Sequence, residues 1–175
     1  MLLVSTVLFG VIYPLAVWGV SQIIFPHEAN GSLVKKDGKI IGSELIGQSW
    51  TSEKYFHSRP SANDYDAANS GGTNLGPTSA KLVERIKSDA EKLQMQNPSQ
   101  KIPVEFITAS ASGLDPHISP AAAEFQILRV ANARNINETD LRKIVEYYTE
   151  TRTFGIFGEP RVNVLKLNLA LDNKF

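Results

Sequence analysis

Four side chains that could carry hydrolytic chemistry lie within one short stretch of the chain: Ser110, Ser112, Asp115 and His117. These are the residue types of a nucleophile, an orienting carboxylate and a general base. However, neither serine has the flanking glycines of the G-x-S-x-G nucleophile elbow. All four also share one loop, whereas a triad takes its members from separate rigid elements. The structural alternative is a strand end that turns toward a helix beginning at Ser119-Pro120, and we predict no catalytic residues.

A second stretch, Gly71 to Thr78, has the glycine spacing of the phosphate-binding pattern G-x-x-x-x-G-K-[ST]. Pro77 stands where that pattern needs its lysine. Proline removes both the charge that contacts the phosphates and a backbone N–H of the cradle. The pattern therefore does not predict nucleotide binding by this loop.

Composition excludes several other classes of site. The chain has no cysteine, a net charge of zero and three scattered histidines. Disulfides and cysteine-ligated metals are therefore impossible, and no basic field favours nucleic acid. The carboxylates Asp64, Asp66 and Asp115 are too dispersed for a cation site, so we predict no metal centre.

The first 25 residues contain no charged side chain. As a helix they would be about 37 Å long, against a hydrocarbon core of roughly 30 Å. A cleaved signal peptide would need a basic start and a small-x-small cleavage site, and both are missing. We therefore predict a retained transmembrane helix over 1–25, kinked at Pro14. Counted literally, the lysines that follow, Lys35, Lys36 and Lys39, would place the rest of the chain in the cytoplasm.

Residues 26–175 read as a single α+β, or mixed α/β, domain. Asp37-Gly38 predicts a hairpin that pairs Val34 with Ile41, and a long loop rich in Gly, Ser, Asn and Pro runs from 47 to 77. Capping residues and apolar spacing predict helices that begin after Thr78, Ser119 and Asn137, each with a core-facing stripe; the first stripe is Leu82, Ile86, Ala90 and Leu93. Alternation predicts strands over 104–108 and 162–171, although the second stretch also fits a helical face.

Several long segments, in the same order, resemble the C subunit of the Kdp-type potassium-transporting ATPase. They are Tyr55–Ser61, Ser70–Leu75, Thr108–Asp115, Ile118–Ala123 and Gly158–Val164. The likeness covers the whole chain. Ser58 stands where the family often has glycine, and the short basic segment usual before the span is absent.

The resemblance implies a non-catalytic accessory subunit of an ATP-driven, high-affinity potassium uptake complex. Its partners would be a channel-like, potassium-selective subunit and a P-type ATPase subunit in the plasma (inner) membrane. It also implies a single span with the main domain extracytoplasmic, against the lysine count. The subunit would be needed for assembly, and a role in raising the pump's ATP affinity has been proposed for the family.

We expect no cofactor to bind firmly to this chain, and we expect ATP to act on it only through the complex. Any direct ATP contact would involve Ser110, Ser112, Gly113 and Gln126, although a domain outside the membrane cannot reach cytoplasmic ATP. We expect the partner interface in the ordered loops, at Tyr55, Phe56, His57, Arg59, Asn74, Asp115 and His117, because exposed aromatic and arginine side chains are favoured anchors. The alternatives are a membrane-anchored extracytoplasmic serine hydrolase and a free-standing binding module.

Overall fold

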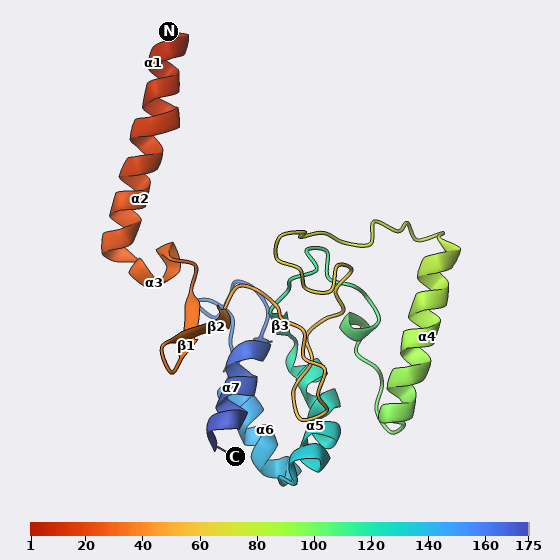
Figure 1. Cartoon of the computed structure of the whole chain (residues 1–175). Coiled ribbons are helices and arrows are strands. Elements are labelled where there is room, and N and C mark those ends of the chain that lie inside the picture. The colour runs from red at the N-terminus through yellow and green to blue at the C-terminus, as the bar shows by residue number, and fades with distance from the viewer. Residues whose placement is uncertain (175) are drawn as a thin grey trace. The chain divides into compact units, whose positions relative to one another are not determined.

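The computed structural model describes residues 1–174, without the side chain of Lys174, so the last residue of the predicted 26–175 domain lies outside it. Its contacts divide the chain into two units, residues 1–45 and 46–175. Helix and sheet are mixed, and an apolar helix comes first, which confirms the predicted fold class (Figure 1).

The first unit begins with a continuous helical stretch over Leu2–Ile24 that is long and apolar enough to cross a membrane. It comprises α1 (Leu2–Val7), the π-helical segment η1 (Leu8–Ile12) and α2 (Tyr13–Ile24). The π segment ends two residues before Pro14. The proline ring clashes with the preceding turn, and proline has no N–H to bond to that turn. Thr6 and Ser21 donate their hydroxyls to the carbonyls of Leu2 and Val17, so these polar groups are satisfied within the helix.

The hairpin of this unit follows α3 (Pro26–Ala29) and pairs β1 (Leu33–Lys36) with β2 (Lys39–Ser43). Asp37 and Gly38 both have positive φ, 51° and 75°, as the predicted two-residue turn requires. The predicted register is wrong. Val34 lies opposite Gly42, because a bulge between Val34 and Lys35 leaves Ile41 unmatched.

The second unit surrounds a small antiparallel sheet with helices. Its elements are α4 (Ala80–Gln96), the 3₁₀ turn η2 (Val104–Phe106), β3 (His117–Ile118), α5 (Pro120–Arg134), α6 (Glu138–Tyr147), β4 (Thr149–Glu150), β5 (Arg161–Asn163) and α7 (Val164–Lys174). The strand order is β3-β5-β4. α5 packs on α6 and on β5, and the core side chains come mainly from α5, α6, β5 and α7.

Two of the three predicted helix starts are confirmed. The Ser119 hydroxyl accepts a hydrogen bond from the Ala122 N–H at the start of α5, and Asn137 caps α6 through the Thr139 N–H. Thr78 is not the cap of α4; Ser79 holds that position, without a side-chain hydrogen bond. The predicted core stripe of α4 is only half-buried, and its Leu93 packs against the core.

Both long strand predictions are wrong. Residues 104–106 form η2 after Pro103, and the Glu105 carboxylate there accepts hydrogen bonds from the Ser119 N–H and hydroxyl. The 162–171 stretch contributes only its first residues to β5. It then becomes α7, because the alternative helical phase buries Val164, Leu167 and Leu171 together.

Candidate functional site

The segment 55–57 is held by side chains rather than by a neighbouring strand. Asn168 of α7 is fully buried, and its carboxamide bonds both backbone groups of Phe56. The Phe56 N–H donates to Asn168 Oδ1 and Asn168 Nδ2 donates to the Phe56 carbonyl, each at 2.9 Å. The Phe56 ring is itself fully buried in the core, so its side chain does not lie at the surface with the rest of the predicted interface.

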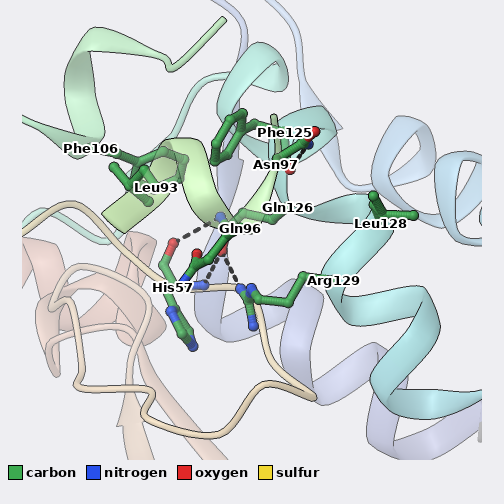
Figure 2. Close-up of a pocket in the computed structure, with 9 residues that line it drawn as sticks. All are labelled: His57, Leu93, Gln96, Asn97, Phe106, Phe125, Gln126, Leu128 and Arg129. Atoms are coloured by element: carbon green, nitrogen blue, oxygen red, sulfur yellow. Dashed lines mark hydrogen bonds between the residues drawn. The ribbon is translucent and has the colours of Figure 1, made fainter. Parts of the chain in front are cut away.

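Gln126 of α5 repeats this arrangement one residue later. The His57 N–H donates to Gln126 Oε1 at 2.8 Å, and Gln126 Nε2 donates to the His57 carbonyl at 3.1 Å. Arg129 also donates to Gln126 Oε1 at 2.7 Å (Figure 2) and to the Tyr55 carbonyl at 3.0 Å. The polar atoms of the buried Gln126 side chain are therefore committed to the backbone of this segment and to Arg129.

The His57 ring bonds the backbone of the preceding residues. Its Nε2 lies 3.2 Å from the Ser52 carbonyl, which accepts a hydrogen bond from the ring N–H. Burial, and next the Arg129 guanidinium, lower the pKa of the His57 imidazole. The ring therefore stays neutral over more of the acid range than an ordinary histidine.

Tyr55 is fixed by three neighbours at the side of this segment. Its hydroxyl donates to Asp172 at 3.0 Å, its ring lies 4.8 Å from the Trp50 ring, and the Arg134 guanidinium is 5.0 Å from its centroid. Arg134 also pairs with Asp172 at 2.7 Å. A half-buried aromatic with a cation over its face is rigidly placed.

Arg59 and Asp115, predicted separately as interface residues, form an ion pair. Arg59 donates to one oxygen of Asp115 at 3.0 Å, and the other oxygen accepts the His117 N–H at 3.0 Å. The His117 ring meets Asn163 across the β3–β5 pair, with Asn163 Nδ2 3.5 Å from His117 Nε2. Burial, and then the Arg161 charge, lower the pKa of His117.

The serine loop is bonded to itself and to neighbouring backbone. The Ser110 and Ser112 hydroxyls lie 3.1 Å apart, and the Ser112 hydroxyl accepts the Leu114 N–H. The Ser110 N–H donates to the Pro60 carbonyl at 2.8 Å. The Asp115 carboxylate bonds the backbone of His117 and not its ring. The geometry is therefore a loop anchor and not a nucleophile–base pair.

Gly113 packs this loop against the preceding one. It has φ +70°, and a Cβ there would meet the Asn63 side chain and, at 2.9 Å, the Gly71 carbonyl. The Gly71 N–H in turn donates to the Ser112 carbonyl. Glycine is thus required both by the backbone conformation and by the close approach. Asn74, further along the same Gly-rich loop, is exposed and has φ +52°.

The cavity beside Gln126 is small. Its volume is ≈ 50 Å³, room for a few water molecules. It lies between the end of α4, η2 and α5, with Leu93, Phe106, Phe125 and Leu128 on its apolar side (Figure 2). Gln126 and His57 line it, whereas Ser110, Ser112 and Gly113 do not. The four residues named for ATP contact are therefore not gathered around this cavity.

Within residues 1–174, no three His, Asp or Glu side chains come together in a way that could hold a metal ion. The polar residues that organise the site are instead Asn168, Arg129 and Arg134, which sequence reasoning missed. A signal existed: Asn168 is a carboxamide between leucines on an apolar helical stripe, and a polar residue on a buried face needs a specific partner.

Comparisons with a family model and with related proteins agree on one family. A family model described as KdpC, K+-transporting ATPase, c chain, matches residues 1–173. The potassium-transporting ATPase KdpC subunit of Koribacter versatilis is 56% identical over 174 residues, covering 98% of this chain and 90% of the relative. That of Bradyrhizobium diazoefficiens is 53% identical over 186 residues, covering 98% and 92%. That of Methylobacterium nodulans is 54% identical over 181 residues, covering 95% and 90%. Together with the family match, these identities across nearly the whole chain show that the protein belongs to the KdpC family of K+-transporting ATPase c chains.

Proposed function

We propose that this chain is a non-catalytic accessory subunit of an ATP-driven potassium uptake pump. It would be anchored by the helix Leu2–Ile24 and would assemble with a channel-like, potassium-selective subunit and a P-type ATPase subunit. The observation that carries the proposal is the family match over residues 1–173, with relatives named as subunits of the potassium-transporting ATPase.

The bonding of the candidate chemical residues supports the non-catalytic part of the proposal. Ser110 and Ser112 bond each other, and Asp115 bonds Arg59 and the His117 backbone. A catalytic serine would instead need a general base, most often a histidine ring, within hydrogen-bond reach. These residues hold the loops of the domain in one arrangement, which is what a rigid partner-facing domain requires.

An effect on ATP affinity would be transmitted through the pump's conformation. The polar groups of Gln126 already bond the backbone of His57 and the Arg129 side chain. A direct contact with nucleotide would have to break these bonds and expose buried backbone groups. Coupling through subunit contacts has no such cost, because it uses the pump's own two-state equilibrium.

The test is to express the other pump subunits with and without this chain, in the membrane of a host that lacks its own pump. Purified complexes are then compared for subunit stoichiometry, for potassium-stimulated ATP hydrolysis and for the KM of ATP. We expect loss of stable assembly and of potassium stimulation when the chain is omitted. Unchanged assembly and hydrolysis would contradict the proposal.

A matched variant separates the accessory role from chemistry by the chain itself. Ser110→Ala combined with Ser112→Ala removes both hydroxyls. It leaves unchanged the helix Leu2–Ile24 and the side chains that bond the 55–57 segment. We expect this variant to support potassium-stimulated hydrolysis at the KM of the unaltered chain. A selective loss of turnover, with assembly intact, would indicate that the serines take part in a reaction.

A further inference from the structure

The connection between β4 and β5 carries three large apolar side chains at its end. Phe154, Ile156 and Phe157 are 88%, 71% and 66% exposed. We call these three residues the apolar tip. Soluble domains rarely leave a contiguous group of large apolar side chains uncovered unless it serves as a contact surface.

The apolar tip is a built turn. The Thr153 N–H donates to the Phe157 carbonyl at 2.9 Å, and the Phe157 N–H returns a bond to the Thr153 carbonyl at 3.0 Å. Phe154, Gly155 and Gly158 have positive φ. For Phe154 this conformation is unfavourable, and the turn's hydrogen bonds hold it there. The side chains are therefore presented on a fixed backbone, which lowers the entropy lost on binding.

Paired charges surround the base of the turn. Arg152 bonds Glu159 at 2.6 Å. On the flanking strands, Arg161 bonds Glu150 at 3.0 Å, and Lys166 of α7 lies 3.9 Å from the same carboxylate. We call these five residues the collar; it has three positive and two negative side chains, and the tip itself carries no charge.

The charge pattern favours a protein over a bilayer as the occupant. Turns and helices that dip into a membrane surface present unpaired Lys and Arg and often Trp or Tyr. Here each basic residue of the collar already has a glutamate partner, which leaves little free positive charge to attract an anionic lipid surface. An aromatic centre inside a rim of paired polar groups is the arrangement of a protein–protein hot spot.

We propose that the apolar tip inserts into an apolar pocket on another subunit of the same pump, with the collar sealing the rim. This inference rests on the proposed function, because it names the contact through which the accessory subunit is held. The partner pocket would be uncharged at its base and would carry polar groups of both signs at its edge.

The first experiment measures binding of the full chain to the remaining pump subunits in detergent. Phe154→Asn with Phe157→Ser removes both rings, and asparagine tolerates the positive φ at 154. We expect the dissociation constant to rise at least about 30-fold, the scale of a hot-spot loss, with unchanged thermal unfolding of the free chain. The matched control is Met95→Ser, which removes an equally exposed apolar side chain from α4 and should leave binding unaltered. Equal binding by the tip variant and the unaltered chain would overturn the inference.

A second experiment distinguishes the two kinds of occupant. Because the chain has no cysteine, Ile156→Cys places a single environment-sensitive fluorophore at the tip. We expect a blue shift only when the labelled chain is reconstituted with the other subunits. A shift in vesicles holding the labelled chain alone would assign the tip to the bilayer, and no shift in either sample would leave the tip in water; both results would overturn the inference. Failure of the unaltered chain to bind the other subunits would instead count against the proposed function itself.

Discussion

Asn168 and Gln126 act at the scale of single residues as substitutes for a β-strand. Each carboxamide presents an acceptor oxygen beside an N–H donor, the same pairing that a neighbouring strand offers to one residue. Phe56 and His57 receive these pairs in succession. The backbone of an irregular segment is thereby satisfied inside the domain, where unpaired N–H and C=O groups would be costly.

Substitution of Asn168 by alanine should destabilise the domain strongly. It would leave the Phe56 N–H and carbonyl buried without partners, at about 1–3 kcal/mol for each group. We expect the free energy of unfolding to fall by about 2–4 kcal/mol in urea titrations of the detergent-solubilised chain followed by circular dichroism. The control is Asn132→Ala, which changes an exposed asparagine on α5. Similar midpoints for the two variants would contradict the role assigned to Asn168.

The lowered pKa of His57 makes stability depend on pH in a defined direction. The unfolded chain binds a proton at His57 at higher pH than the folded chain does, because burial and Arg129 disfavour the folded cation. The contribution of neutral His57 to the free energy of unfolding is therefore fully present above the unfolded pKa of about 6.5. It falls as the pH drops below that value. We expect unfolding at pH 5.5 to require less urea than at pH 7.5. His57→Gln, which keeps a neutral donor for Ser52, should reduce that difference, and an undiminished difference would exclude His57 as a source.

At the scale of elements, the start of α5 is joined to η2. The Ser119 hydroxyl caps the helix and also donates to the Glu105 carboxylate, so η2 is attached to the helix that carries Gln126. Nearby, the loop that ends at Asp115 packs against residues 63–71 through Gly113. These attachments position loops in which the sequence predicts partner contacts, at residues such as Arg59 and Asp115.

Gly113→Ala tests the loop packing. The added methyl group would meet the Gly71 carbonyl and the Asn63 side chain, and alanine would be strained at φ +70°. We expect a loss of about 1–3 kcal/mol in the free energy of unfolding. Gly76→Ala is the matched control in the same pair of loops, since a Cβ there meets no atom within 4 Å. Equal unfolding midpoints for the Gly113→Ala and Gly76→Ala variants would contradict the close packing assigned to Gly113.

Local signals predicted the elements whose ends are set by nearby residues. Ser119 and Asn137 cap helices because their side chains reach N–H groups two or three residues away. The stretch after Val162 was ambiguous because alternating leucines fit both periods, and only burial of Val164, Leu167 and Leu171 around distant partners selects the helix. The pairing of Asn168 with Phe56 could not be read locally, because the two residues are 112 positions apart.

At the scale of the whole molecule, the apolar helix Leu2–Ile24 is the one helix within residues 1–174 that could cross a membrane. We propose that the second unit lies on the extracytoplasmic side. Ser88→Cys tests it, since Ser88 is exposed on α4 and the chain has no cysteine. We expect a membrane-impermeant maleimide to label this variant on intact cells whose outer envelope is permeabilised. Labelling only after lysis of the plasma membrane would place the unit in the cytoplasm, as the lysine count indicates. A cytoplasmic protein with an introduced surface cysteine serves as the lysis control.

The pairing of Asn168 with Phe56 also determines when the core can close during synthesis. Asn168 lies near the end of the chain and binds Phe56 near the start of the second unit, so the core stays open until α7 has been made. Closing such a long loop is slow compared with forming local helices. The nascent domain therefore emerges with apolar segments uncovered, a state in which chains tend to aggregate. For the same reason, a stop codon before α7 would yield a protease-sensitive chain, even though the helical anchor and most of the sequence would be present.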